Sequence, residues 1–117
     1  MEDFVPSEIA KKLKEKGFEY ECFGHYFNNE FYTDMPPKYY QREKYVSAPT
    51  ISQVLKWLRE THNIFIVVFI NDDTNNPVSY EIYEGVECVL CVHRYFSLND
   101  WSKAEIDAIE YVLDNLI

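Results

Sequence analysis

The sequence predicts one α+β domain over residues 1–117, with elements in the order α-ββ-α-βββ-α and an antiparallel sheet covered by helices mainly on one face. Three observations predict this class. They are a capped amphipathic helix near the middle of the chain, alternating apolar strands after it, and a closing helix with a broad apolar face. A chain of 117 residues suits a single domain with its own core.

The N-terminal part of the chain is expected to form a short helix over residues 8–16, with Ser7 as its capping residue. Gly17 follows this helix and suits the left-handed conformation in which many helices end. Ile9, Ala10 and Leu13 would form its narrow apolar stripe.

The next segment, residues 18–33, is rich in aromatic side chains and favours strands over helix. Asn28-Asn29 indicates a turn, so we expect a hairpin with arms near 19–27 and 31–33. Pro36-Pro37 interrupts regular structure, and the remainder to residue 48 is predicted as a loop or an edge extension.

The clearest local signal is the capping box Thr50-Ile-Ser-Gln53, in which each side chain satisfies the backbone amide of the other residue. It predicts a helix over residues 51–61. The apolar residues that follow recur on one helical face: Ile51, Val54, Leu55 and Leu58.

The strands of the C-terminal half begin with IFIVVFI, residues 64–70. Both sets of alternating residues in this run are apolar, so it is predicted as a central strand covered on both faces. In 78–83 the residues alternate, with Val78, Tyr80 and Ile82 on one side. Glu84-Gly85 indicates a tight turn in which Gly85 supplies the positive φ.

The last strand is expected over residues 86–96, with Val86, Cys88, Leu90 and Val92 on one face. Asp100 is the predicted cap of the closing helix. Its broad apolar face is expected to consist of Ala104, Ile106, Ala108, Ile109, Val112, Leu113 and Leu116.

The charge balance limits the partners that the chain can have. The formal net charge is −9, from 20 acidic and 11 basic residues, so the chain as a whole opposes binding to a nucleic-acid backbone. The longest apolar run is too short to span a membrane as a helix, and the N-terminus lacks the features of a signal peptide. We expect a cytoplasmic protein with reduced thiols, no membrane contact and no nucleic-acid partner.

The cysteines raise the question of a zinc or redox site, because C-x-x-C at Cys88 and Cys91 and C-x-x-H at Cys22 and His25 could together supply four ligands. In an uninterrupted strand, however, Cys88 and Cys91 point to opposite faces and cannot share an ion or close a disulfide. We therefore expect no metal and no cofactor, with Cys88 in the core. Cys91, His93 and Tyr95 remain together on the second face.

Catalytic motifs are lacking in the sequence: the three glycines stand alone, and no cysteine is paired with a histidine in a recognisable pattern. We expect no catalytic residue and a protein that is not an enzyme. An enzyme would require a pocket in which a His and a Cys or carboxylate converge.

An interaction surface is the preferred interpretation. Residues 18–45 hold about ten aromatic side chains, and exposed tyrosines often mark interfaces. The alternative is that most of these side chains pack on the second face of the sheet. If that face is open, it is a candidate homodimer surface; an unknown protein is the other partner that we expect. The candidate interaction residues are Tyr26, Tyr32, Tyr39, Tyr40, Cys91, His93 and Tyr95.

The order α-β-β-β-α over the last part of the chain resembles the double-stranded-RNA-binding domain, and Ser102-Lys103-Ala104 is similar to the start of that family's final helix. The resemblance implies phosphate contacts by basic residues there. Here Lys103 matches a basic position, but the residues that follow it include Glu105, Asp107 and Glu110. This inverted charge argues for a shared shape without a shared ligand.

The same charge supports an alternative function. A protein with spaced carboxylates, such as Asp107, Glu110 and Asp114, could imitate nucleic acid and inhibit a DNA-binding or DNA-processing enzyme. Acidic surfaces also give ordinary solubility without any partner.

Two segments, SAPTISQVLKWLRETHNIFIVV (47–68) and AEIDAIEYVLDNLI (104–117), are similar to a family of small uncharacterised proteins of gut bacteria and their prophages or mobile elements. The tyrosine-rich hairpin around 79–83 belongs to the same pattern. This resemblance implies a shared fold and a mobile-element setting, and it carries over no binding residue. We expect a non-catalytic accessory protein that acts through protein contacts.

Overall fold

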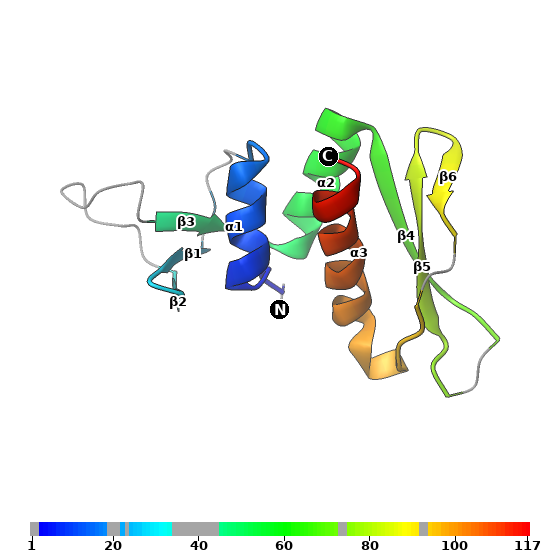
Figure 1. The fold of residues 1–117 in the computed structure, drawn as a ribbon. Helices are drawn as coiled ribbons and strands as arrows, with labels where there is room; N and C mark the ends of the chain where they lie inside the picture. The colour runs from blue at the N-terminus through cyan, green and yellow to red at the C-terminus, as the bar shows by residue number, and fades with distance from the viewer. Residues whose placement is uncertain (1–2, 19–21, 23, 34–44, 73–74, 92–93) are drawn as a thin grey trace. The chain divides into compact units, whose positions relative to one another are not determined.

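The computed structural model describes residues 3–18, 22, 24–33, 45–72, 75–91 and 94–117. The chain divides into two compact units, residues 1–53 and 54–117, and each unit is described by itself. The predicted α+β class is confirmed, because the described part holds three α-helices and two small antiparallel sheets in roughly the predicted order (Figure 1). Within these ranges, no helix combines the length and the apolar character that a bilayer crossing needs.

The first unit contains α1 (Ser7–Glu15) and a sheet formed by β1 (Gly24–Phe27), β2 (Glu30–Tyr32) and β3 (Tyr45–Ala48). The strand order is β2-β1-β3, all antiparallel, so β1 is central. β3 is the edge extension that the sequence left open as an alternative to a loop.

The β1–β2 hairpin turns where the sequence predicts it. Asn28 and Asn29 have φ angles of 51° and 66°. Two successive left-handed residues define the turn whose twist matches that of the flanking strands, and asparagine tolerates this conformation better than most residues.

Helix α1 begins differently from the prediction that Ser7 caps it. Pro6 occupies the capping position, with an extended ψ of 162°, and no side chain caps the helix. The Ser7 hydroxyl lies 3.1 Å from Oδ1 of Asn29 instead. The predicted end is confirmed, since Gly17 has a φ of 91°.

Helix α2 (Ile51–His62) begins at the predicted capping box. The Thr50 amide donates to Oε1 of Gln53 at 2.8 Å, and the Gln53 amide donates to Oγ1 of Thr50 at 3.2 Å. The start of the chain is tied to the same point, because the Ile51 amide donates to the carbonyl of Asp3 at 2.9 Å.

The second unit contains a sheet and the helix that covers it. The strands are β4 (Ile64–Ile70), β5 (Val78–Glu84) and β6 (Glu87–Leu90); a short 3₁₀ turn, η2 (Leu98–Asp100), leads into α3 (Trp101–Asn115). All neighbours are antiparallel in the order β4-β5-β6. α3 packs on β4 and β5, and Figure 1 shows α2 on the same side of this sheet.

The predicted central position of residues 64–70 is wrong. β5 is central and β4 lies at the edge, with the side chains of Phe65 and Val67 36% and 45% exposed. The expectation relied on a rule for sheets buried on both faces. Three strands joined in sequence by hairpins instead place the first strand at an edge.

The predicted strand over 86–96 is also wrong in its length and its faces. A register shift lies between Ile82 and Tyr83, so Leu90 pairs with Ile82 while Cys88 pairs with Tyr83. The extra residue reverses the alternation, and Cys88 is exposed where the sequence predicted core. Val86 is 98% exposed in the turn that Gly85 makes possible with a φ of 62°.

Asp100 stands at the capping position of α3, as predicted, but its side chain makes no capping hydrogen bond. Its carboxylate accepts a hydrogen bond from the Ser97 hydroxyl at 3.0 Å and lies 3.5 Å from Nζ of Lys103. The preceding 3₁₀ turn explains the difference, because it supplies the entry to the helix in place of a side-chain cap.

The capping box yields a stability prediction. Thr50→Ala removes the acceptor for the Gln53 amide, so the free energy of unfolding should fall by about 1 kcal/mol in urea titrations. Ser52→Ala is the matched control, since Ser52 lies in the first turn of the same helix and its side chain is exposed. Equal effects of the two substitutions would contradict a stabilising role for the box.

Candidate interaction surface

The β4–β5–β6 sheet has two unlike faces. Val78, Tyr80 and Ile82 of β5 are completely buried on the side that α3 covers. Alternation therefore turns Glu81 and Tyr83 to the opposite side, where the register pairs them with Val67 and Phe65. We call this side the outer face and define it by the residues Phe65, Val67, Phe69, Glu81, Tyr83 and Cys88.

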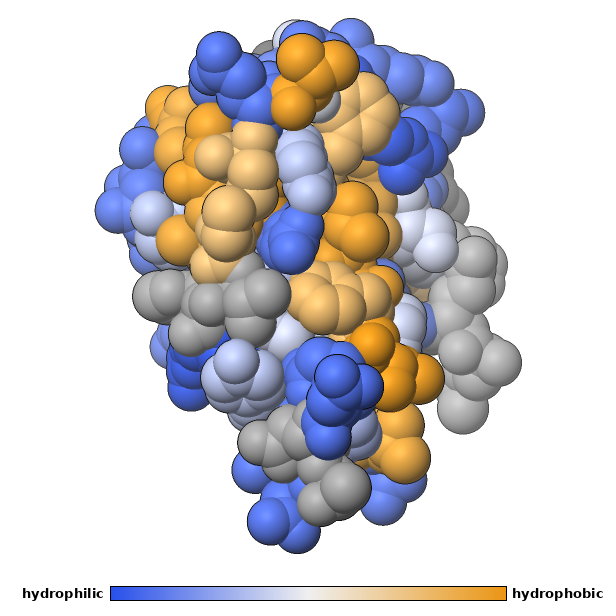
Figure 2. Space-filling view, turned by 90° about the vertical axis from the view of Figure 1, so that its right-hand side faces the viewer, coloured by the Kyte–Doolittle hydropathy of each residue, from blue (hydrophilic) through white to orange (hydrophobic). Residues whose placement is uncertain are grey.

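The outer face is mainly apolar. Figure 2, viewed from the side on which β4–β6 lie, shows apolar side chains over much of this face, with hydrophilic ones between and around them. Its one carboxylate, Glu81, accepts a short hydrogen bond from the Tyr83 hydroxyl. This bond, more than burial, raises the pKa of Tyr83 to about 12. The Tyr83 hydroxyl thus has its partner on the same face, and most of the other side chains there are rings and methyl groups.

The edge of β4 adds a second feature to this surface. Among the described residues β4 pairs only with β5, along an uninterrupted register from Ile64–Glu84 to Ile70–Val78. Edge strands usually carry a charge, a proline or a bulge that discourages pairing with another chain. The sequence of β4, IFIVVFI, has no charge and no proline, and its register shows no bulge.

A polar network fixes α3 to β5 on the other side of the sheet. The buried Tyr80 hydroxyl donates to Oδ2 of Asp107 at 2.6 Å, and the Arg94 guanidinium donates to Oδ1 at the same distance. Burial, and then the hydrogen bond to Asp107, raise the pKa of Tyr80 well above its ordinary value. Asp107 therefore has two partners within the fold and is not an acidic group held ready for a ligand.

This network borders a shallow hollow of about 190 Å³. Glu110 and Asp114, which the sequence grouped with Asp107, both lie on its wall. The described residues that line it are Tyr80, Arg94, Asp107, Glu110, Tyr111, Asp114 and Asn115.

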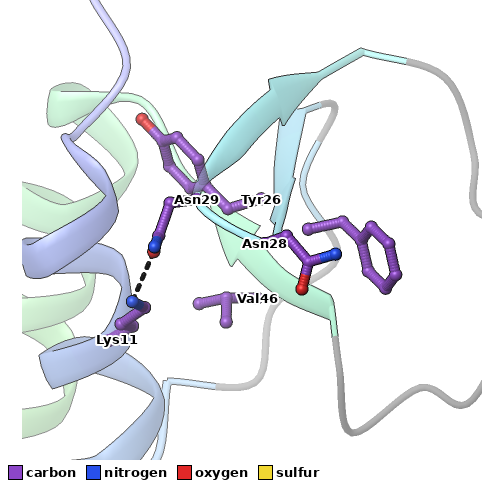
Figure 3. A pocket seen from close by; sticks show the side chains of 6 residues that line it. Lys11, Tyr26, Asn28, Asn29 and Val46 are labelled. Carbon is purple, nitrogen blue, oxygen red and sulfur yellow. Dashed lines mark hydrogen bonds between the residues drawn. The ribbon is translucent and has the colours of Figure 1, made fainter.

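The first unit has a larger hollow of about 420 Å³ beside the Asn28-Asn29 turn. Figure 3 shows Lys11 reaching across it to Asn29, where its ammonium lies 2.5 Å from Oδ1. The other lining residues are Tyr26, Phe27, Asn28 and Val46. The lysine is thus engaged by an amide of the same unit, and the described residues that line this hollow include no carboxylate, His or Cys.

The predicted interaction residues of the first unit lie on opposite faces of its sheet. Tyr26 pairs with Phe31 and Tyr32 with His25, in neighbouring positions of the register. The Tyr26 hydroxyl is bound inside the unit, donating to the carbonyl of Val5 at 2.7 Å. Tyr32 is exposed, and its hydroxyl donates to Glu30. Tyr39 and Tyr40 lie outside the described residues.

In the second unit, Cys91 and Tyr95 are both exposed, and His93 lies outside the described residues. The predicted separation of Cys88 and Cys91 is wrong, because their Sγ atoms are 2.6 Å apart. Strand parity does not apply to this pair, since the register shift displaces Cys88 and β6 ends at Leu90, before Cys91.

Phe65 and Val67 are surface residues that the sequence-based prediction missed, and Phe69 on the same face is half-buried. Their run was assigned to the interior because it is apolar at both parities. The predicted meander order carried the contrary signal, since the first strand of a three-strand meander has one neighbour in its sheet.

Comparisons of this chain with family models, curated proteins and solved structures gave no match.

The Tyr80–Asp107 hydrogen bond predicts how substitution of Tyr80 changes the stability of the fold and how that change depends on pH. Tyr80→Phe should lower the free energy of unfolding by about 2 kcal/mol near neutral pH, because it removes a buried hydrogen bond to a charged acceptor. Tyr95→Phe, at an exposed position, is the control and should change stability by less than about 0.5 kcal/mol.

Above pH ~10 the unfolded chain ionises its tyrosines, whereas folded Tyr80 keeps its proton. The stabilising contribution of Tyr80 is therefore complete below pH ~10 and is lost as the pH rises. Urea titrations over a pH series should show a shallower alkaline loss of stability in Tyr80→Phe than in the unmodified chain. The same alkaline slope in both would show that Tyr80 ionises normally in the fold.

Proposed function

We propose that this chain is a small, acidic, non-catalytic accessory protein of the cytoplasm, derived from a phage or mobile element, that acts through protein–protein contacts. The single observation that supports this most is an apolar outer face on the same sheet as the β4 edge, with which no other strand among the described residues pairs. Monomeric proteins rarely expose both features together, because each favours association.

The partner that fits this edge is a second copy of the chain. The sequence of β4 reads nearly the same in both directions: Ile64 matches Ile70, Phe65 matches Phe69, and Ile66 resembles Val68. An antiparallel pair of β4 strands with Val67 on the two-fold axis would bring these residues opposite one another. Such self-complementarity is the requirement of a symmetric dimer.

The pairing has a clear energetic basis. It would give hydrogen-bond partners to the backbone groups on the outer edge of β4, and it would join the two outer faces into one apolar surface. Cross-strand pairs of aromatic and β-branched residues contribute about 0.2–1 kcal/mol each. The net charge of −9 on each copy opposes association, so the dimer should strengthen with salt, which screens that repulsion.

The test is the mass of the particle in solution over a concentration series, measured by light scattering or sedimentation equilibrium. The unmodified chain should dimerise, and Val67→Lys should remain a monomer because it places two ammonium groups together at the axis. Val86→Lys is the matched control, since it makes the same change at an exposed turn position outside the outer face.

Circular dichroism shows whether each variant is folded. If Val67→Lys does not fold, Val67→Thr takes its place in the test. Threonine keeps the branched shape of valine and should weaken the dimer with little effect on the strand. A chain that remains monomeric up to ~1 mM, where the association would be weaker than about −4 kcal/mol, would contradict the second copy as partner.

Imitation of nucleic acid is the second candidate, supported by the net charge and by Glu110 and Asp114 on one wall of a hollow. The Arg94–Asp107 ion pair weakens this support, since it neutralises one of the spaced carboxylates. Inhibition of DNA-processing enzymes that fades as salt is raised is the result expected of a mimic. A broad panel of such enzymes left unaffected at low salt would leave the protein-contact function as the remaining proposal.

A further inference from the structure

Cys88 and Cys91 form a close pair at the end of β6. The register shift turns Cys88 to the outer face beside Tyr83, and Cys91 follows the last residue of the strand. Their sulfur atoms are 2.6 Å apart as thiols, within a small movement of the ~2.05 Å of a disulfide bond. The fold thus brings the two sulfurs together.

Both thiols are also accessible to reagents in solution. Cys88 and Cys91 are exposed, whereas Cys22 is partly buried in the other unit. Thiol–disulfide exchange requires access to the sulfur as well as a second thiol that can complete the reaction. Cys88 and Cys91 meet both conditions.

We propose that Cys88 and Cys91 are a reversible redox site that low-molecular-weight disulfides convert into an intramolecular disulfide. One cysteine thiolate attacks the small disulfide, forming a mixed disulfide and releasing one small thiolate. The second cysteine, as its thiolate, attacks the protein sulfur of that mixed disulfide and releases the other small thiolate. Two electrons pass from the cysteines to the small disulfide, and the two cysteine protons end on the released thiols.

The hydrogen bond between the two sulfurs, more than desolvation, raises the pKa of Cys88 above its ordinary value. The reaction should therefore become faster as the solution becomes more alkaline, since the thiolate is the attacking species. Oxidation would join the residue after β6 to the strand and so fix the bulged end of the sheet. The proposal does not depend on dimer formation.

The first experiment counts thiols after equilibration in a buffer of oxidised and reduced glutathione, followed by alkylation and intact mass measurement. The folded chain should lose two alkylation sites and two hydrogens, and peptide mapping should place the bond between Cys88 and Cys91. Cys22→Ser should behave in the same way. Retention of two separate glutathione adducts at Cys88 and Cys91, or a bond between chains, would overturn the proposal.

The second experiment separates a property of the fold from the mere closeness of two cysteines in sequence. The glutathione ratio at half oxidation is compared for Cys22→Ser in native buffer and in concentrated urea. The folded chain should favour the disulfide at least about tenfold more, which is ~30 mV for this two-electron couple. Equal values in the two solvents would show that the fold does not bring the thiols together.

A thermodynamic cycle gives an independent check. If folding favours the disulfide tenfold, the disulfide must favour folding by the same factor. Urea titrations of the oxidised and reduced forms of Cys22→Ser should therefore differ by that factor in the unfolding equilibrium constant. Ser substitution at Cys88 should abolish the difference. A difference that persists in Cys88→Ser would assign it to another cause and contradict the redox site.

Discussion

The second unit depends on the attachment of α3 to one face of a three-stranded sheet. Small residues at Ala104 and Ala108 let the helix approach β5, and Tyr80 crosses from the strand to Asp107 with a buried hydroxyl. A single layer of helices can cover only one side of such a sheet. The exposed rings and methyl groups on the opposite side follow from this arrangement, and so does the association that we propose for them.

Local chemistry is the part of the fold that could be read from the sequence. Thr50 and Gln53 hold each other's amides, and Asn28 and Asn29 take left-handed angles, because these preferences involve neighbours in the chain. The place of β4 depends instead on which strand lies beside it, and a run of apolar residues is compatible with a central or an edge position. Pro6 in place of Ser7 at the start of α1 is a smaller case of the same kind, since Ser7 finds a partner at Asn29.

The cysteines illustrate how a sound rule fails when one premise changes. Residues three apart in a regular strand do point to opposite sides. A single register shift beside Tyr83, and the end of β6 at Leu90, remove the regular strand on which the rule depends. No feature of the CVLCVHR stretch announces a bulge, because Val89 and Leu90 suit an extended chain with or without one. The exposure of the candidate interaction residues could not be predicted from the sequence for the same reason, since exposure and pairing are properties of the assembled sheet.

The bulge at β6 also bears on how large an assembly this sheet could build. A strand that is apolar at both parities, like β4, incurs little penalty for slipping along its partner, which is the behaviour of sequences that polymerise into fibres. In the proposed symmetric pair the two copies of β4 pair with each other, and β6 is then the remaining edge strand of this sheet among the described residues. That strand is four residues long, irregular in register, and begins with the exposed carboxylate of Glu87. These features of β6 disfavour further strand pairing at the far edge of the sheet, so the association that we propose through β4 would close at two copies.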